Sequence, residues 1–403
     1  MPEAKYRILR LINRFNLGGP TYNVTYLTRY LVPEFETLLV GGMKENSEAS
    51  SDFILEQNGI KPIIIEEMRR SINPVNDIAA YKNIKKLIKD FKPHIVHTHA
   101  AKAGALGRMA AFSCNVPVTL HTFHGHVFHS YFGSMQTAVY KNIERYLASR
   151  TTALVAISEK QKHELAESHK IAPASKFHVV PLGFDLEKFW TNQEEKRTEF
   201  RKKYHIEDNE IAIGIIGRLV PVKNHRMFLD AFNYVKKRTR KKVKAFIIGD
   251  GELLTELMQN CKELGLSYTS RHSLHPDFDV FFTSWIKEVD TANAGLDIVA
   301  LSSLNEGTPV SLIEAQAAGR PIVSTQTGGI ENVVIPGTTA LLSPVGNVQA
   351  FGDNLLKLCD DDAFREFLSG KGRDFVSAQF SYTSLALNMS KLYHTLLQEK
   401  RVK

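Results

Sequence analysis

The sequence has few residues that cross-link small domains, and it has no long apolar run. Cysteine occurs three times in 403 residues, at distant positions and without a Cys-x-x-Cys pair. A disulfide scaffold and a zinc ribbon are therefore excluded, and a reducing, cytoplasmic compartment is expected. The longest stretch free of Asp, Glu, Lys and Arg, residues 109–140, carries four histidines and two glycines, so no membrane span is predicted.

What the sequence does contain is an ordinary globular balance with a basic excess. Hydrophobic residues make up 43 % and charged residues 23 %, and the formal net charge is +8. This balance excludes a disordered tail protein and a collagen. The basic excess fits an anionic partner such as phosphate, nucleotide, acidic lipid or nucleic acid. At about 150 residues per domain, two domains are the simplest reading.

Short apolar runs alternate with amphipathic stretches along the whole chain, which indicates βαβ units and parallel sheets. Strands are predicted at YRILRLI, ETLLVGG, KPIIIE, PHIVHTH, PVTLHTF, ALVAIS and FHVVPLG, and then at IAIGIIG, KAFIIGD, DVFFTSW, DIVALSS, PIVSTQ and TALLSP. Helical stretches lie between the strands, such as residues 23–31 and 78–91. We therefore predict two doubly wound α/β domains, residues 1–185 and 186–381. The tail, residues 382–403, is predicted to be a helix with apolar residues at helical spacing.

The strongest chemical signal follows the predicted strand at residues 297–301. Thr308 is predicted to cap the next helix and Pro309 to occupy its first position. The amides of Val310 and Ser311 then point out of the sheet edge, which favours an anion.

Two carboxylates flank this helix start. Glu306 lies in the loop before it, and Glu314 lies six residues past the cap, about 9 Å along the axis. One carboxylate beside a phosphate site and another deeper in the helix suit a nucleotide, with the inner one accepting the ribose hydroxyls. The alternative is a capped helix with surface glutamates.

Two other loops carry weaker signals. In GRLVPVKNH, Arg218 and Lys223 stand at the two ends of a short loop after a strand, where a forked guanidinium and a mobile ammonium suit a diphosphate. The alternative is a pair of solvated surface charges. In NLGGPTYNV, Gly18 and Gly19 leave a helix start open to a ligand, or simply form a tight turn.

The ordered set of motifs resembles a known family. The motifs are NLGGPTYNVTYL, HIVHTHAAKAGALGRMAA, HTFHGHVF, VVPLGFDLEKF, GRLVPVKNH and NEGTPVSLIEA. Together they are similar to retaining glycosyltransferases of family four, which have the GT-B fold. The resemblance covers nearly the whole chain. It implies two Rossmann-like domains facing a cleft, with the nucleotide sugar held by the C-terminal one, the acceptor by the N-terminal one, and the last helix crossing back.

The resemblance also implies roles for single residues. Catalysis is expected from His124, near the reacting sugar, and from Glu306. Donor binding is expected from Gly19, Arg218, Lys223, Gly307, Thr308, Pro309, Val310, Ser311, Leu312 and Glu314. The family stabilises the leaving diphosphate without a cation, so neither a metal nor another cofactor is expected. The segment RHSLHPDFD, longer than usual, lies where the family contacts the base.

Three other functions compete with glycosyl transfer. A UDP-sugar 2-epimerase shares the fold and needs no acceptor. A metal-dependent hydrolase would use His97 and His99, with His121 converging on them. The run KKRTRKKVK suits nucleic acid, although no aromatic residue interleaves it, so no nucleic-acid partner is expected. Asp277 and Asp279 form a DXD, which we interpret as chance.

The sequence thus predicts transfer of a hexose or N-acetylhexosamine, from a UDP-sugar by preference, to a glycan or lipid-linked acceptor of cell-surface polysaccharide synthesis. A basic amphipathic helix predicts peripheral contact with the inner face of the cell membrane. Its apolar face comprises Ile78, Tyr81, Ile84, Ile88 and Phe91, and VFHSYF at residues 127–132 is expected to assist. The alternative is a helix that packs its apolar face on a sheet and leaves its basic face in solvent.

Overall fold

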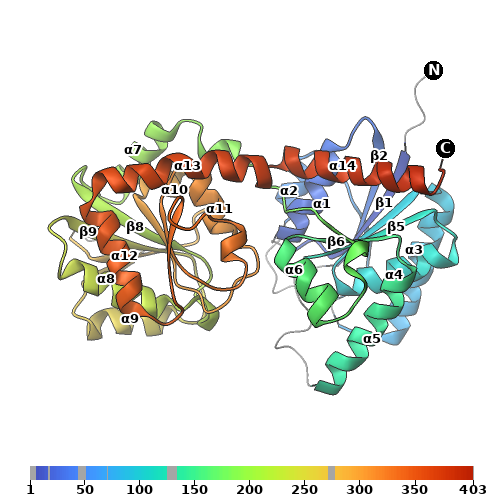
Figure 1. The fold of residues 1–403 in the computed structure, drawn as a ribbon, viewed down its shortest axis with the longest axis horizontal. Helices are drawn as coiled ribbons and strands as arrows, with labels where there is room; N and C mark the ends of the chain where they lie inside the picture. The colour runs from blue at the N-terminus through green and yellow to red at the C-terminus, as the bar shows by residue number, and fades with distance from the viewer. Residues whose placement is uncertain are drawn as a thin grey trace. The chain divides into compact units, whose positions relative to one another are not determined.

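The computed structural model describes residues 6–16, 19–43, 51–69, 71–124, 134–270 and 277–402, without the side chains of 134–136. The chain forms two compact units. Unit 1 comprises Met1–Phe184 and Gln379–Lys403, and unit 2 comprises Asp185–Ala378. Each unit contains a seven-stranded, fully parallel sheet with helices on both faces (Figure 1).

The sheet of unit 1 has the strand order β3-β2-β1-β4-β5-β6-β7. The strands are β1 Tyr6–Arg14, β2 Phe35–Gly42, β3 Ile63–Ile65, β4 Ile95–His99, β5 Val118–Phe123, β6 Ala153–Ala156 and β7 Phe177–Val179. The helices are α1 Gly19–Tyr30, α2 Asp52–Gln57, α3 Pro74–Phe91, α4 Ala101–Ser113, α5 Ser134–Arg150, α6 Glu159–His163 and the returning α14 Tyr382–Glu399.

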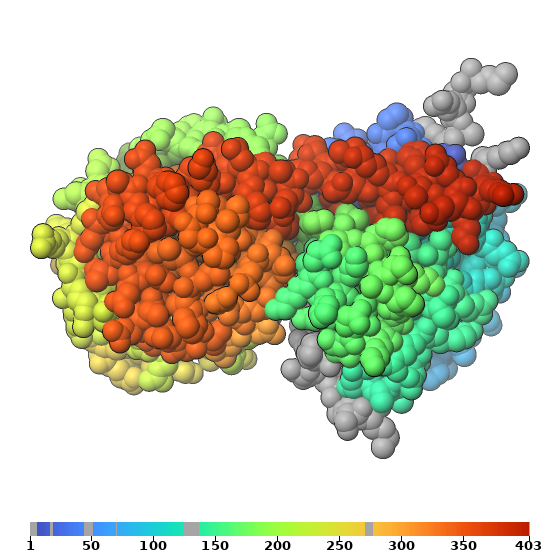
Figure 2. All heavy atoms as spheres, viewed as in Figure 1, coloured from blue at the N-terminus to red at the C-terminus, as the bar shows by residue number. Residues whose placement is uncertain are grey.

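Helix α14 completes the core on one face of this sheet. Leu385, Met389, Leu392 and Leu396 are buried against residues of α1 and of the central strands. The predicted helical spacing of the tail is therefore used for packing inside unit 1. Figure 2 shows the other side of α14 as a red band on the surface of the unit.

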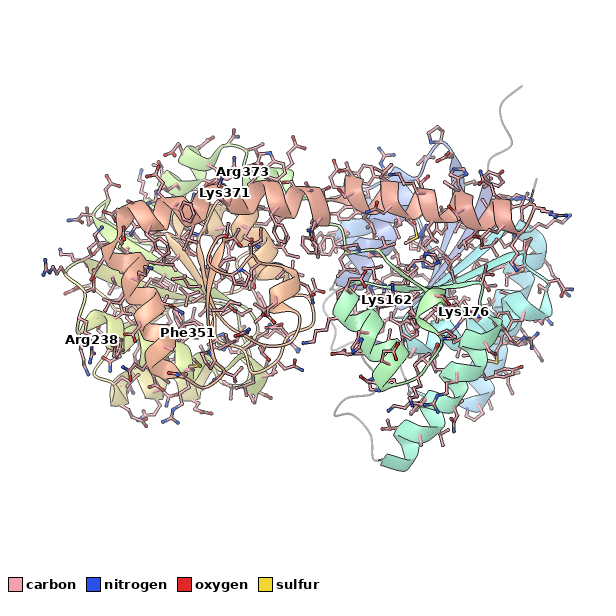
Figure 3. The ribbon with its side chains drawn as sticks, in the orientation of Figure 1. Lys162, Lys176, Arg238, Phe351, Lys371 and Arg373 are labelled. Carbon is pink, nitrogen blue, oxygen red and sulfur yellow. The ribbon has the colours of Figure 1, made fainter. Side chains whose placement is uncertain are left out.

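The sheet of unit 2 has the order β10-β11-β9-β8-β12-β13-β14. The strands are β8 Glu210–Ile216, β9 Lys242–Ile248, β10 Tyr268–Ser270, β11 Val280–Ser284, β12 Ile298–Leu301, β13 Ile322–Thr325 and β14 Ala340–Ser343. The helices are α7 Gln193–Lys203, α8 His225–Lys236, α9 Leu254–Glu263, α10 Val289–Gly295, α11 Val310–Ala317, α12 Val348–Asp360 and α13 Asp362–Phe380. Phe351 of α12 is fully buried in the core of the unit (Figure 3).

Three local differences separate this fold from the sequence prediction. Strand β10 was not predicted, because its sequence, YTS, is not an apolar run. Helix α1 begins at Gly19 and not at Asn23. Helix α3 begins at Pro74 and not at Ile78, because Asn73 caps the amides of residues 75 and 76 and proline suits the first helical position.

The apolar face predicted to lie on a membrane is mostly used inside unit 1. Ile84 and Ile88 of α3 are buried in the core beneath the sheet, and Tyr81 and Phe91 pack against the same cluster. Those residues are therefore not available to a bilayer, and that part of the prediction is wrong. Ile78 alone of this set is largely exposed, at 57 %. The segment 127–132 lies outside the described residues.

The basic run KKRTRKKVK is engaged in contacts within unit 2. Lys236 pairs with Asp279, Lys244 with Glu210 and Lys241 with Asp362. Arg238 stacks on Tyr234, with its guanidinium carbon 3.7 Å from the ring centroid. These contacts hold strand β9 and the end of α8 in place.

Over the described part of the chain, no helix has both the length and the apolar character that a membrane crossing requires.

Candidate active site

Ligands of open parallel sheets bind beyond the carboxyl ends of the strands, where the strand order reverses. In unit 2 this reversal lies between β8 and β12, and in unit 1 it lies between β1 and β4. The loops after β8 and β12 carry most of the predicted donor-binding residues. The reversal in unit 1 is flanked by the start of α1 and by the histidines of β4 and β5.

The loops after β8 and β12 are joined by hydrogen bonds and by one ion pair. Lys223 Nζ lies 2.5 Å from Glu306 Oε1, which also accepts from Ser303 Oγ at 2.6 Å. Ser302 Oγ donates to the backbone carbonyls of Lys223 and Asn224. The structure therefore places the predicted diphosphate cation and the predicted sugar carboxylate in direct contact.

Arg218 precedes Lys223 in the same loop. Its side chain is exposed and has no polar partner among the described residues. Its loop is supported from behind by residues 249–251, which follow β9. Leu219 N–H donates to the carbonyl of Asp250, and a Cβ at Gly249 would stand 1.9 Å from the carbonyl oxygen of Gly217. Gly249 therefore allows the close approach that supports the Arg218 loop.

Helix α11 begins one residue later than predicted. Val310 is its first residue, and Pro309 takes the cap position with extended backbone (φ −73°, ψ 96°) and no side-chain cap. The prediction that Thr308 caps the helix is therefore wrong, because the extended proline moves the helix start past it. The first amides of a helix have no intrahelical acceptor, so Val310 and Ser311 still offer donors to an anion.

Glu314 lies on the second turn of α11, where desolvation raises its pKa to about 7. Lys188 lowers this pKa and Asp290 raises it further. In the free protein the carboxyl is therefore about half protonated at neutral pH. A pair of ribose hydroxyls that donates to the carboxylate would favour the ionised form.

Donor binding is expected to strengthen as pH rises through 7. With a pKa of about 7, roughly one Glu314 in ten is ionised at pH 6, so affinity for UDP-glucose should be about tenfold weaker at pH 6 than at pH 8. The diphosphate of this ligand does not titrate in that range. Calorimetry at several pH values measures the effect, and Glu314→Gln should abolish the slope. A slope that survives this substitution would contradict the assignment.

Two of the glycines predicted to bind the donor have open space where a side chain would stand. A Cβ at Gly307 would meet no atom within 4 Å, and one at Gly19 would only touch Leu182 at 3.7 Å. Packing among the described residues of each unit therefore does not explain these glycines. Gly307 lies in the loop after β12 and Gly19 begins α1, and both were predicted to approach a ligand.

Sequence reasoning missed the glycine pair that follows β13. A Cβ at Gly329 would stand 1.7 Å from the carbonyl oxygen of Gly307, and Gly329 N–H donates to the carbonyl of Glu306. This pair fixes the Glu306–Gly307 loop from its far side. The signal was the double glycine after a predicted strand, in STQTGG.

The histidines of unit 1 that the structure describes do not form a metal centre. His97 lies opposite Leu120 in the sheet, whereas His121 lies opposite Thr98, so His97 and His121 point to opposite faces. His121 accordingly bonds Thr98 Oγ1, at 2.9 Å. In the described ranges no three His, Cys, Asp or Glu side chains are arranged to hold a metal. The alternative in which His121 converges on His97 and His99 is therefore wrong.

His124 follows β5 and forms a pair with His99. Its Nε2 lies 2.8 Å from His99 Nδ1, and desolvation lowers the His124 pKa to about 4. His124 is therefore neutral at pH 7. It lies on the edge of unit 1 where the sheet order predicts a ligand.

The remaining acidic motif is structural. Asp279 accepts from the amide and hydroxyl of Ser267 and pairs with Lys236, so it joins β11 to the chain before β10. This agrees with the interpretation of the DXD as chance. Most of the RHSLHPDFD segment expected near the base, residues 271–276, lies outside the described residues.

Comparison with known families assigns both halves of the chain. The model described as "Glycosyl transferases group 1" matches residues 196–375, and "Glycosyltransferase Family 4" matches residues 17–188. The chain is a family-four glycosyltransferase. The two matched segments each cover most of one structural unit, so the whole two-domain architecture belongs to this family.

Several curated relatives span nearly the full chain. The UDP-Gal:alpha-D-GlcNAc-diphosphoundecaprenol alpha-1,3-galactosyltransferase of Escherichia coli is 26 % identical over 92 % of this chain and 94 % of its own length. The capsular polysaccharide biosynthesis glycosyltransferase CapM of Staphylococcus aureus is 26 % identical over 84 % of this chain and 87 % of its own. Both are named as transferases, which favours transfer over epimerisation.

Solved structures show the same fold. HepE of Anabaena in complex with UDP superposes with a TM-score of 0.78 at 17 % identity, covering 96 % of this chain and all of its own. The lipopolysaccharide biosynthesis glycosyltransferase WaaG gives 0.69 at 14 % identity, covering 96 % of this chain and 99 % of its own. The predicted GT-B fold is thereby confirmed.

Proposed function

We propose that this glycosyltransferase moves a hexose or N-acetylhexosamine from a UDP-sugar to a lipid-linked glycan, with retention of configuration. One observation carries the proposal: a cation, a carboxylate in contact with it and the open start of a helix lie together at the strand-order reversal of unit 2. The names of two relatives suggest the substrate classes. One name gives a UDP-sugar with a diphospholipid-linked acceptor, and the other gives a capsular polysaccharide.

Each of these groups has a defined part in the reaction. Arg218 and Lys223 bind the diphosphate and offset the charge it gains as its bond to the sugar breaks. The amides at the start of α11 assist them. Glu306 orients the sugar ring, and Glu314 accepts the ribose hydroxyls. His124, in the acceptor-binding unit, contacts the reacting sugar.

The function is tested in two steps with the full chain. A panel of UDP-, GDP- and TDP-sugars is screened for thermal stabilisation and slow hydrolysis, and the best donor is then offered to an N-acetylglucosamine diphospholipid. We expect one UDP-sugar to stabilise the chain and to yield a disaccharide-lipid whose new bond keeps the donor's anomeric configuration. Product formed with inversion, or epimerisation of the donor without acceptor, would contradict the proposal.

Transfer is expected to proceed at full rate in excess EDTA. Two basic side chains and a helix start are expected to neutralise the diphosphate, so the charge balance does not require a metal ion. The measurement is product formation with and without EDTA, followed by addition of Mg²⁺ or Mn²⁺. Complete loss that manganese restores would show that a metal takes part.

We propose peripheral membrane contact through the start of α3, in place of its buried face. Ile72, Val75 and Ile78 are 70, 76 and 57 % exposed, and the lysines of the same helix add about 1 kcal/mol each near an anionic surface. Flotation with anionic vesicles should show salt-sensitive binding that Val75→Glu weakens several-fold. The matched control is Val139→Glu on α5, a comparably exposed site at 55 %. Equal binding to neutral vesicles, or none, would refute this contact.

A further inference from the structure

A guanidinium is buried at the centre of the unit 1 sheet, and none of the acidic side chains that the structure describes pairs with it. Arg10 of β1 has no exposed surface, and its Nη2 donates to the hydroxyl of Tyr393 on α14 at 3.3 Å. Its Nε and Nη1 have no hydrogen-bond partner among the described residues. Burying a charge is costly unless it is compensated, and desolvation accordingly lowers the Arg10 pKa. Packing alone does not account for this residue.

The Tyr393 hydroxyl links Arg10 to His97 through hydrogen bonds. It lies 2.6 Å from His97 Nδ1, and His97 Nε2 lies 2.8 Å from Thr122 Oγ1. Since the hydroxyl oxygen accepts from Arg10, its own proton is directed to His97 Nδ1. His97 therefore carries its proton on Nε2 and donates to Thr122.

The next residue on the same face is His99, which shares one hydrogen bond with His124. Burial lowers the pKa of both imidazoles, so both are neutral at pH 7. Two neutral imidazoles that share one hydrogen bond contain one donor and one acceptor at that bond. The two outer nitrogens, His99 Nε2 and His124 Nδ1, must then differ: one carries a proton and the other does not. Both are buried and have no partner within the described ranges.

The charges around His99 decide which arrangement is favoured. The groups that act on it are His97, whose ring centroid is 4.2 Å away, His124, Arg10 of β1 and His121 of β5, and all of them lower its pKa. No carboxylate is among them. Arg10 is the permanent charge in this set, and its effect reaches His99 but not His124. In the sheet, β4 lies between β1, which carries Arg10, and β5, which leads to His124. The two nitrogens of an imidazole point nearly away from each other, so with Nδ1 turned to His124, Nε2 of His99 is turned to the β1 side. A proton on His99 is therefore more stable on Nδ1, farther from the Arg10 charge.

We propose that His99 is a positioning residue that donates through Nδ1 to His124, and that Arg10 sets this direction. His124 then carries its proton on Nδ1 and presents it to the substrate as a hydrogen-bond donor, not as a base. A donor suits an oxygen that gains negative charge in the transition state. The proposal rests on the catalytic role proposed above for His124.

The first test reads the tautomers directly and needs no activity. The full chain is labelled with ¹⁵N-histidine, and the two-bond ¹⁵N–¹H correlations of His99 and His124 are assigned by their loss in His99→Asn and His124→Gln. We expect His124 to be protonated on Nδ1 with Nε2 bare at pH 7. Protonation on Nε2, or on both nitrogens, would overturn the proposal. A chain without transferase activity would leave this result readable.

The second test separates positioning from packing. His99→Leu should lower kcat about tenfold to a hundredfold, as loss of an orienting partner does elsewhere, with KM for the donor unchanged. His99→Asn should restore most of this loss, because its amide can donate from a place close to Nδ1. The matched control is His121→Asn, a buried histidine on the opposite face of the sheet, which should keep kcat. Equal losses in Leu and Asn variants, or a rise in KM alone, would overturn the positioning role.

The third test concerns Arg10 and its contact with Tyr393. Removing a neighbouring positive charge raises the pKa of an imidazole, so Arg10→Met should move the acidic limb of the kcat profile to higher pH. Tyr393→Phe keeps the ring but removes the hydroxyl that Arg10 contacts. It should move the acidic limb of the kcat profile in the same direction if Arg10 then moves away from His99. A profile that stays where it is in both folded variants would remove Arg10 from the proposal.

Discussion

Alanine at Arg218 or Lys223 is expected to lower turnover by about 10²–10³-fold, or roughly 3–4 kcal/mol, because each side chain stabilises charge that develops on the leaving diphosphate. The melting temperature should change little at Arg218, which is exposed and without a recorded polar partner among the described residues. Lys223→Ala should lower turnover to a similar extent. It should also remove the ion-pair partner of Glu306, because Lys223 contacts Glu306 Oε1 in the native protein. Steady-state kinetics, UDP affinity and thermal melting distinguish these effects.

Two further variants sharpen this prediction. Arg218→Lys should recover only part of the activity, because an ammonium cannot bind two oxygens in a fork. Arg226→Ala is the matched control, since Arg226 is an exposed arginine on the first turn of α8 with no assigned part in binding the donor. Near-normal turnover in both Arg218→Ala and Lys223→Ala would refute the assignment of this loop.

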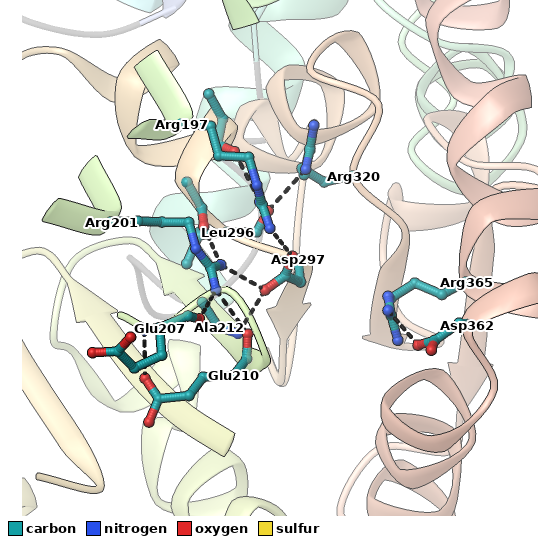
Figure 4. Close-up of polar contacts among 12 residues, drawn as sticks. Arg197, Arg201, Glu207, Glu210, Ala212, Leu296, Asp297, Arg320, Asp362 and Arg365 are labelled. Atoms are coloured by element: carbon teal, nitrogen blue, oxygen red, sulfur yellow. Dashed lines mark hydrogen bonds and ion pairs between the residues drawn. The ribbon is translucent and has the colours of Figure 1, made fainter. Parts of the chain in front are cut away.

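Asp297→Ala is expected to destabilise the protein by about 3–5 kcal/mol, which is typical when one partner of a buried ion pair is removed. Its carboxylate accepts from Arg197 at 2.8 Å and from Arg201 at 3.1 Å, and it also accepts the amide of Ala212 at 2.8 Å (Figure 4). Removal would leave Arg201, whose side chain is only 5 % exposed, with a buried charge that carbonyl groups alone must satisfy. Urea denaturation gives the change in the free energy of unfolding.

The matched control lies in the same unit. Asp362 pairs with Arg365 on the surface, and its side chain is 64 % exposed (Figure 4). Asp362→Ala should cost no more than about 1 kcal/mol, since exposed ion pairs are screened by water and salt. Similar losses at both positions would show that burial does not govern the Asp297 cluster.

The sequence alone was sufficient for the fold class, because buried parallel strands are nearly continuous apolar runs and the helices between them are long and periodic. It also located the loops after β8 and β12, since strand ends and glycines mark them. Motif resemblance then supplied roles for Arg218, Lys223 and Glu314. Boundaries were less certain: α3 starts four residues early because Asn73 caps it, and α11 starts late because Pro309 is extended.

Contacts between distant parts of the chain were decided only by the tertiary structure. Periodicity cannot show that Lys223 touches Glu306, or that Gly329 supports Gly307, because these contacts depend on how loops from separate strands meet. Periodicity also cannot show on which face of the sheet a histidine side chain lies. His97 and His121 looked convergent in sequence, but a register offset of one residue places them on opposite faces. The register of β1 on β4 aligns Arg10 with His97, and helix α14 brings Tyr393 from the far end of the chain into contact with both.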